Sequence, residues 1–365
     1  MTNHALGKLI AEGGSYLTSN VATRDHYTPG TIPKFRKVRG RKVKVGTRQI
    51  FQPLPELAKL QEQLIDELRT YKIGTHDAAH AYRSGRSVKS MAAPHVGKLK
   101  LMSIDIKDFF PSVKWSLVSS QLPRNVPRSL QDLIRRWCFL DGGLPQGAPS
   151  SPFLCNVALY ALDQKIAGFL RKWRSPTLNI LDPEKLQPKF WRTEPIAYTR
   201  YSDDLVFSSN YQSLQHMEKI ITSMIRKSGF VVNPKKIKHS DKRSQRQYVT
   251  GIVINEKLSA PKALRRRLRS DLHRMILDTA GGVCPKLHKL DAEGNILPLN
   301  EQNPDYPFAK LAGEVEFVRF VCPEQAEPLT KRLEILIEVH TLDEANWSDG
   351  TSAYTKKCLN TLQLT

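Results

Sequence analysis

The chain has 365 residues, with 56 Lys or Arg against 35 Asp or Glu, so its formal net charge is +21 at pH 7. Hydrophobic residues make up 40 % and charged residues 25 %, a composition that is typical of a folded globular protein and excludes a disordered one. No uncharged apolar run approaches the roughly 18–20 residues that cross a bilayer. The five cysteines are scattered and lie outside CxxC pairs, which argues against a disulfide framework or a zinc site. A cytoplasmic protein without membrane contact is therefore expected.

The first half of the chain predicts three elements. Leu57, Leu60, Leu64 and Leu68 recur at helical spacing and predict an amphipathic helix over 56–70. Residues 98–106, KLKLMSIDI, alternate and predict a strand. A mostly buried helix is expected over 150–172, with Ser151 as its N-cap and a proline at its first helical position.

The second half predicts a hairpin followed by strands and helices. Residues 196–209 indicate two strands around a turn at SDD, and 214–228 predict a helix that Gly229 ends. A strand is expected over 248–254, and helices over 262–279 and 329–339. Residues 175–195 and 281–307 are rich in proline and polar residues and are expected to be insertions.

The positive charge is concentrated in three runs. Residues 34–48 hold eight basic residues and no acid, 226–246 hold eight against one acid, and 262–274 hold six against one. A single run of this kind is as easily a solvated face. Three runs separated by apolar segments favour a surface that follows a phosphate backbone, so nucleic acid is the first partner to expect.

Two acidic sites stand at the ends of predicted strands. Asp105 follows the apolar strand in SIDIKDFFPSV, and Asp203 and Asp204 lie at the tip of the predicted hairpin in RYSDDLVFS. An isolated Asp pair at a hairpin tip is usually only a turn. Carboxylates that meet beside apolar strands need a cation, and two Mg²⁺ ions can activate a hydroxyl and stabilise a leaving phosphate.

A Gly/Pro-rich loop lies between the two acidic sites. Leu144 to Asn156, LPQGAPSSPFLCN, leads into the helix expected over 150–172, and its tight backbone suits close approach of a nucleotide. Gln146 could hydrogen-bond that nucleotide. An ordinary turn before a capped helix explains the same residues equally well.

Taken in order, these segments resemble a reverse transcriptase. SIDIKDFFPSV is similar to polymerase motif A, LPQGAPSSPFLCN to motif B, YSDD to the YxDD box of motif C, and Gly229-Phe230 with Asn233 and Lys236 to motif D. The resemblance is to the bacterial retron group in particular. Val249-Thr250-Gly251 matches its VTG signature, and residues 76–98 resemble its NAxxH region, with Met91 at the Asn position and Ala92 and His95 kept.

The resemblance implies an α+β right-hand polymerase. Residues 1–100 would be fingers, and 101–258 a palm with an antiparallel, βαββαβ-like sheet interrupted by the insertion 175–195. Residues 259–365 would be a helical, RNA-binding thumb with the insertion 281–307. Zinc is not expected at His76, His80 and His95, because no Cys or acidic partner stands at ligand spacing.

The resemblance also implies roles for individual residues. Asp105 and Asp203, assisted by Asp204 and the Ile106 carbonyl, would hold two Mg²⁺ ions. Phe110 matches the position of the steric gate that favours dNTPs over ribonucleotides. The other implied roles are triphosphate contacts from Lys44 and Arg48, pyrophosphate protonation by Lys236, and RNA contacts from Arg265, Arg266, Arg267, Arg269 and Arg274.

The implied reaction is Mg²⁺-dependent synthesis of DNA from dNTPs on an RNA template. For a retron enzyme, the implied partners are a structured non-coding RNA (msr–msd), its branched DNA product (msDNA) and a separately encoded effector in antiphage defence. Two alternatives remain open. One is a group II intron-like or other defence-associated reverse transcriptase, and the other is a non-catalytic, polymerase-shaped RNA-binding scaffold.

Overall fold

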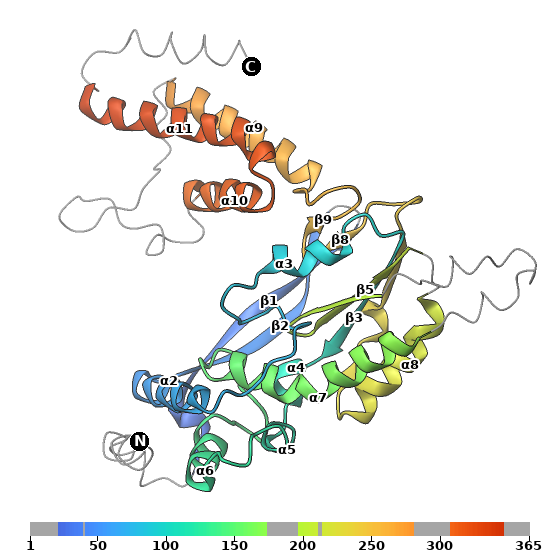
Figure 1. Ribbon diagram of the computed structural model, residues 1–365. Coiled ribbons are helices and arrows are strands. Elements are labelled where there is room, and N and C mark those ends of the chain that lie inside the picture. The colour runs from blue at the N-terminus through green and yellow to red at the C-terminus, as the bar shows by residue number, and fades with distance from the viewer. Residues whose placement is uncertain (1–20, 39–40, 174–195, 211–213, 281–306, 347–365) are drawn as a thin grey trace, which may run out of the picture. The chain divides into compact units, whose positions relative to one another are not determined.

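The computed structural model describes residues 21–38, 41–173, 196–210, 214–280 and 307–346 (Figure 1). The predicted insertion 175–195, and that of 281–307 except its last residue, lie outside them. The chain divides into two compact units, Met1–Gln245 and Arg246–Thr365. All four predicted motifs A–D fall in the first unit.

A five-stranded antiparallel sheet forms the centre of the first unit. Its middle strand, β3 (Lys100–Lys107), pairs on one side with β5 (Asp204–Ser209), which in turn pairs with β4 (Ala197–Tyr201). On its other side β3 pairs with β6 (Val231–Val232) and β7 (Lys238–Asp241). With α7 (Ser151–Lys172) and α8 (Gln215–Lys227), the chain order is β3–α7–β4–β5–α8–β6. The predicted α+β class and βαββαβ order are confirmed.

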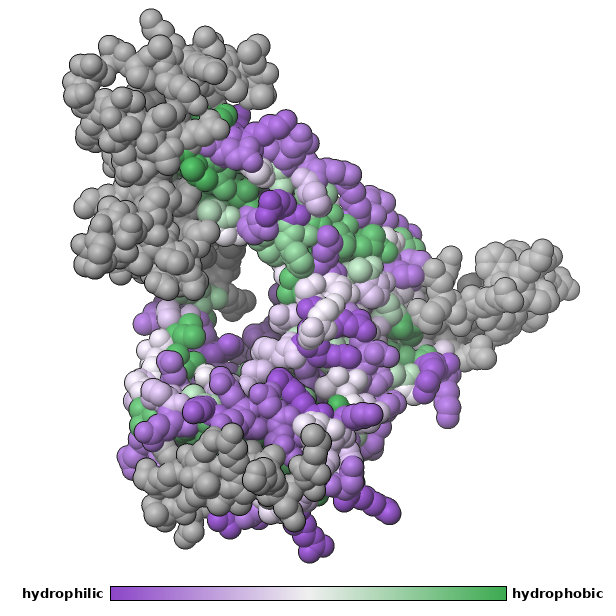
Figure 2. Space-filling view, turned by 60° about the vertical axis from the view of Figure 1, so that its left-hand side comes forward, coloured by the Kyte–Doolittle hydropathy of each residue, from purple (hydrophilic) through white to green (hydrophobic). Residues whose placement is uncertain are grey.

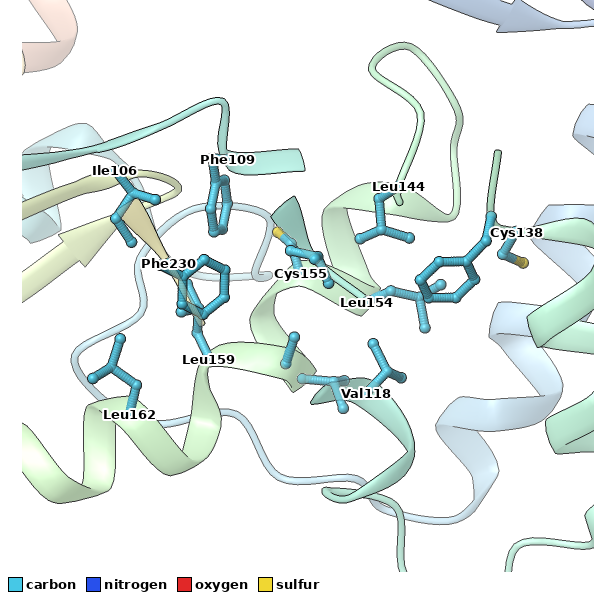
Figure 3. Packing of buried hydrophobic residues seen from close by; sticks show 14 of the residues in the cluster. Ile106, Phe109, Val118, Cys138, Leu144, Leu154, Cys155, Leu159, Leu162 and Phe230 are labelled. Carbon is cyan, nitrogen blue, oxygen red and sulfur yellow. The ribbon is translucent and has the colours of Figure 1, made fainter. Parts of the chain in front are cut away.

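The core lies between this sheet and helices α7 and α8. Phe109, Phe230 and Leu159 are buried members of one hydrophobic cluster, which also takes in residues of β3, β5 and α8. Figure 3 shows Ile106, Phe109 and Phe230 on one side of this packing, and Leu159 and Leu162 of α7 on the other. Buried apolar side chains therefore pack against the carboxyl-terminal end of β3.

Helix α7 begins as predicted but is capped differently. Ser150, not Ser151, occupies the N-cap position, and Pro152 is the second helical residue. The Ser151 hydroxyl instead donates a 2.7 Å hydrogen bond to the carbonyl oxygen of Pro145. This bond ties the helix to the preceding Gly/Pro-rich loop, so the serine holds the loop rather than the helix end.

A long hairpin that the sequence did not predict precedes the sheet. Strands β1 (Tyr27–Val38) and β2 (Arg41–Pro53) pair over their whole length, with a register shift at Lys34/Phe35. The sequence did not indicate this hairpin because β1 contains Pro29, Gly30 and Pro33, and proline and glycine are normally depleted in strands. Helix α2 (Pro55–Thr70) follows and confirms the predicted leucine periodicity.

Short helices make up the other helical segments in the described part of the first unit. They are η2 (Arg24–His26), α3 (Val88–Ala92), η3 (Ala93–His95), α4 (Phe109–Ser112), α5 (Trp115–Ser119), α6 (Arg128–Trp137) and η7 (Pro234–Lys236). Helices α3 and η3 pack against β4, and α6 packs against α2. These contacts fix α3 and η3 to the sheet and α6 to α2.

In the described residues of the second unit, a small hairpin is followed by three helices. The single strand predicted over 248–254 is wrong: β8 (Tyr248–Val249) and β9 (Ile252–Val253) form a hairpin around Thr250 and Gly251, both at positive φ. Helix α9 (Lys262–Ala280) matches its prediction, and α10 (Pro307–Val321) was not predicted. Helix α11 (Pro323–Asn346) is longer than the expected 329–339, because Pro328 lies inside it rather than before it.

Polar surface predominates on the face of the molecule shown in Figure 2, with smaller hydrophobic patches between hydrophilic residues. None of the helices in the described ranges has the length and hydrophobicity needed to cross a membrane. The apolar residues instead form two buried clusters, one in each unit.

Candidate active site

The register of the sheet brings the predicted carboxylates to one end of β3. Asp105 pairs directly across the ladder with Asp204, the first residue of β5. Asp203 lies in the turn before it, and its carbonyl oxygen accepts a 3.1 Å hydrogen bond from the Ile106 amide. Side chains that face each other in an antiparallel pair are about 4.5–5.5 Å apart at Cβ. Motifs A and C therefore meet within a single rung of the ladder.

Burial, and then the charges of neighbouring carboxylates, raise the pKa of two of these acids. Burial, reinforced by the charge of Asp105, raises the pKa of Asp203 above its ordinary value, against the opposing charges of Lys236 and Arg48. The pKa of Asp204 rises to about 6, first through partial desolvation and then through the charges of Asp203 and Asp105. Neighbouring anions destabilise one another in this way unless a cation is shared.

Lys236 supplies a positive charge to this end of the sheet. Its Nζ lies 2.6 Å from Oδ2 of Asp105, although the Lys236 side chain is 53 % exposed and that of Asp105 only 9 %. The lysine is held in η7, and the Asn233 amide just before that turn donates to the Asp105 carbonyl oxygen at 2.9 Å. The motif D segment thus contacts Asp105 through both backbone and side chain.

Phe110 follows β3, which carries Asp105, and lies in helix α4. Its ring centroid lies 5.4 Å from that of buried Phe109 and 6.4 Å from that of Tyr82. The Phe110 carbonyl oxygen accepts a 3.1 Å hydrogen bond from the Leu144 amide. A side chain at Gly143 would come within 2.3 Å of the Pro111 carbonyl oxygen. Motif A and the Gly/Pro-rich loop are therefore in direct backbone contact.

Gln146 lies in that loop, bound to the N-terminal hairpin. Its carbonyl oxygen accepts a 2.6 Å hydrogen bond from the amide of Phe51 on β2. Gly147 has a φ of +109°, and a Cβ there would lie 3.1 Å from the Phe51 carbonyl oxygen. A glycine is required at this contact, because only glycine combines that conformation with such a close approach.

The two predicted triphosphate ligands both lie on β2. Arg48 stands opposite Ile32 and Lys44 opposite Phe35, and both basic side chains are exposed. The positive charge of Arg48 opposes the rise in the pKa of Asp203 that burial causes. Lys44 lies four residues nearer the turn of the hairpin. Of the two, Arg48 is the residue that the structure brings into electrostatic reach of the carboxylates.

A buried ion pair that the sequence analysis missed lies behind the candidate site. Arg200 on β4 and Asp163 on α7 are both fully buried, with Nη2–Oδ2 at 2.8 Å and Nε–Oδ1 at 3.0 Å. Asn156 accepts from Arg200 at 3.1 Å, and the Tyr198 hydroxyl donates to Asp163 at 2.6 Å. An acid within the apolar helix VALYALDQKIAGFL was the available signal, because buried carboxylates require a partner.

The segment around the NAxxH-like residues is fixed to the sheet. The two ring nitrogens of buried His95 hydrogen-bond with Ser208 Oγ and Thr199 Oγ1, both at 2.7 Å. Met91, at the position of the family Asn, is fully buried, and its carbonyl oxygen accepts from Thr199 Oγ1 at 3.2 Å. Burial lowers the pKa of His95 to about 3, so its ring is neutral. These contacts give the segment a packing role beside β4 and β5.

The five predicted RNA-binding arginines all lie on α9 in the second unit. Arg266, Arg269 and Arg274 are exposed. Arg267 is engaged with Asp271 at 3.4 Å and with Glu314 at 2.5 Å, and Arg265 Nε donates to the Ala260 carbonyl oxygen at 3.3 Å. Arg266, Arg269 and Arg274 are therefore the better candidates for phosphate contacts.

The oxygen-rich site suits a hard cation such as Mg²⁺, which prefers carboxylate, carbonyl and phosphate oxygens. The raised pKa values of Asp203 and Asp204 mark a place where a cation would relieve repulsion. Within the described residues, no three Asp, Glu, His or Cys side chains form a closed ligand cluster. The protein provides a partial set of oxygen ligands, and phosphate oxygens would have to supply others.

Comparison with known proteins identifies the family. Residues 36–253 match the model of the family described as reverse transcriptase (RNA-dependent DNA polymerase). The chain belongs to the reverse transcriptase family. The matched range includes β2, the whole sheet, the Gly/Pro-rich loop and the three carboxylates, so family membership and candidate site rest on the same residues.

Several curated relatives of this chain are bacterial retron reverse transcriptases, which confirms the predicted resemblance. It is 30 % identical to the retron Mx65 reverse transcriptase of Myxococcus xanthus over 327 residues, covering 84 % of this chain and 64 % of that protein. It is 29 % identical to the retron Ec83 reverse transcriptase of Escherichia coli over 271 residues, covering 70 % of this chain and 76 % of that protein. A structure of apo telomerase from Candida tropicalis aligns with a TM-score of 0.46 and 12 % identity, covering 95 % of this chain and 65 % of that one.

Proposed function

We propose that this chain copies a structured non-coding RNA into single-stranded DNA, with the end of β3 as its active site. The observation that carries the proposal is the direct pairing of Asp105 with Asp204 beside Asp203, within a reverse transcriptase domain. Residues 1–100 would act as fingers, 101–258 as palm and 259–365 as thumb. The RNA would supply the template and, through a 2′-hydroxyl, the primer.

In this proposal Asp105, Asp203 and the Ile106 carbonyl, assisted by Asp204, hold two Mg²⁺ ions. Bound Mg²⁺ would activate the attacking hydroxyl and stabilise negative charge on the phosphate that is displaced. Lys236 contacts Oδ2 of Asp105 at 2.6 Å and would move away as a metal ion takes its place at that oxygen. The freed ammonium group can then donate a proton to the pyrophosphate, as a general acid does.

The remaining residues would select and orient the substrate. Arg48, with Lys44 further along β2, neutralises the triphosphate of the incoming dNTP. Phe110 lies below the sugar and excludes a ribose 2′-hydroxyl, while Gln146 contacts the nucleotide from the loop bound to β2. Exposed arginines of α9 bind duplex phosphates without reading the bases. We further propose a branched msDNA product and a role in antiphage defence with a separately encoded effector.

The test is to express the gene with its native upstream flank and extract the nucleic acid that copurifies with the protein. After RNase digestion, we expect one short, discrete single-stranded DNA that keeps a 2′-linked ribonucleotide at its 5′ end. Asp203→Asn should abolish it. Asp66→Asn makes the same chemical change at an exposed carboxylate of α2 and should leave it intact.

Other outcomes decide between the competing functions. DNA made only from an added primer and template, and not from the native flank, would indicate a reverse transcriptase of another kind. Absence of DNA under both conditions, with the RNA still bound, would favour a binding scaffold and contradict the proposal.

A further inference from the structure

Tyr82 has a backbone conformation that a bulky residue rarely adopts. Its φ is +59°, in the left-handed region, and its side chain remains 45 % exposed. A non-glycine residue at positive φ is strained, and such strain persists only where the surrounding structure enforces it. The exposed ring also excludes a simple role as core filling. A requirement beyond local folding therefore keeps this ring where it is.

The residues before Tyr82 are fastened to the sheet and to α7. The Ala81 carbonyl oxygen accepts a 2.8 Å hydrogen bond from Asn156 of α7. The Ala78 carbonyl oxygen accepts from the Arg200 amide at 2.6 Å, and the His80 amide donates to the Arg200 carbonyl oxygen at 2.8 Å. The same Arg200 is fixed by Asp163 inside the protein. The backbone leading into Tyr82 is thus held by a buried network.

The Tyr82 side chain lies between motif A and motif C. Its ring centroid is 6.4 Å from that of Phe110, the gate residue, and 6.4 Å from that of Tyr201. Its hydroxyl donates to Ser202 Oγ at 3.4 Å, one residue before Asp203. Phe110 also contacts Phe109, which is buried. The gate ring therefore has two aromatic neighbours, and Tyr82 is the exposed one.

We propose that Tyr82 is a specificity-determining positioning residue, which holds the Phe110 ring in the orientation that excludes ribonucleotides. The proposal rests on the function proposed above, since it assumes that Phe110 faces the sugar. Without Tyr82 the Phe110 ring has free space on its exposed side and can turn away from the 2′-hydroxyl. Loss of the Tyr82 ring then weakens discrimination against ribonucleotides while dNTP incorporation persists.

The test compares dNTP and rNTP incorporation by the full-length protein on an added RNA template and DNA primer. The measured quantity is the ratio of kcat/KM for a dNTP to that for the matching rNTP. Tyr82→Gly removes the ring and suits the positive φ, so it introduces no new backbone strain. Tyr82→Phe removes only the long hydrogen bond to Ser202. Phe110→Ala measures the selectivity that the gate itself provides.

We expect Tyr82→Gly to lower the selectivity ratio by roughly 3- to 10-fold, the range that an aromatic pair contributes. Tyr82→Phe should keep the ratio of the wild type. In the Phe110→Ala background, Tyr82→Gly should have no further effect on the ratio, because residues that act through one another are not additive.

Three results would overturn the inference: an unchanged ratio in Tyr82→Gly with both kcat/KM values unchanged, an unchanged ratio because both values fall equally, or the same fold-change in the ratio with and without Phe110. The first result would leave Tyr82 without a role in selection, and the second would indicate a general contact with nucleic acid. A wild-type protein that incorporates neither nucleotide in this assay and also makes no DNA from its native flank would refute the proposed function itself, so the two failures are distinguishable.

Discussion

Two carboxylate–cation pairs in the first unit differ sharply in their surroundings. Arg200 and Asp163 are fully buried, and both groups have further hydrogen-bond partners in Asn156 and Tyr198. Lys236 and Asp105 are also in contact, but the lysine is 53 % exposed, and two further carboxylates lie beside Asp105. One pair is closed on every side, whereas the other is open to solvent on the side of its cation.

The difference separates a carboxylate that holds the fold from one that is free to change partner. A buried charge that loses its counter-charge is left in a medium that solvates it poorly. An exposed lysine is rehydrated as soon as it moves away, so its contact with Asp105 is easily exchanged. Stability is therefore expected to depend on Asp163 and activity on Asp105, although both are aspartates paired with a cation.

The largest effect on stability is expected at the buried pair. Asp163→Asn leaves the Arg200 guanidinium buried without a counter-charge and should lower the free energy of unfolding by about 3–5 kcal/mol. Denaturant unfolding followed by circular dichroism measures the change. Tyr198→Phe, which removes only the hydroxyl that donates to Asp163, is the matched control and should cost about 1 kcal/mol. Equal losses in the two variants would contradict the special role of the buried charge.

An intermediate effect, dependent on pH, is expected at His95. Burial lowers its pKa to about 3 in the folded chain, whereas an unfolded histidine titrates near 6.5. As the pH falls below 6.5, the unfolded chain binds a proton that the folded chain excludes, so stability is lost as the pH falls. The loss at pH 5 should be roughly 2 kcal/mol.

His95→Gln isolates this contribution. Glutamine keeps hydrogen-bonding capacity but does not titrate, so the variant should lose less stability than the wild type between pH 7 and pH 5. Burial also lowers the pKa of His80, to about 4. Because both proteins contain His80, its contribution to the pH dependence of stability has the same direction in each and cancels in the comparison. Parallel pH profiles for wild type and His95→Gln would show that His95 is protonated in the folded state.

The smallest effect on stability, with a large effect on activity, is expected at Lys236. Lys236→Gln removes the exposed partner of Asp105, whose charge water readily screens, and should change the free energy of unfolding by only about 0–1 kcal/mol. DNA synthesis should fall by about 10²-fold if the ammonium group acts as a proton donor. Loss of its charge also removes an influence that lowers the pKa of Asp203 and Asp204, so the acid limb of the pH–rate profile should move to higher pH.

Lys236→Arg is the matched control for that variant. It keeps the positive charge, so the acid limb should stay where it is in the wild type. Its guanidinium is a poor proton donor, so the rate should remain low. A rate restored to the wild-type level by arginine would assign Lys236 an electrostatic role alone.

Sequence periodicity and turn chemistry predicted the elements that carry the site. The strand ending near Asp105, the hairpin around Asp203 and the helix closed by Gly229 all form close to their expected bounds. Each has a strong local signal: alternation for the strands, a polar turn for the hairpin, and a glycine with φ of +87° after the helix. The resemblance then predicted that Asp105 would act together with Asp203, assisted by Asp204.

Features that depend on contacts distant in sequence could not be predicted in this way. Hairpin β1–β2 carries prolines and charges that argue against strands, and its pairing outweighs those local preferences. Arg200 and Asp163 are 37 residues apart, and nothing local links them. Tyr82 stands next to Phe110 only because the buried network fixes its backbone, so its position follows from tertiary structure alone.

The spacing of the candidate carboxylates follows from the backbone of the sheet. Asp105 and Asp204 occupy opposite positions on neighbouring strands, and neighbouring strands lie about 4.7–4.9 Å apart in every β-sheet. Surrounding side chains can therefore drift through evolution, change volume or exchange polarity without altering the distance between the two acids. The distance between these two acids is thus set by hydrogen bonds of the peptide backbone, which side-chain substitutions do not change directly.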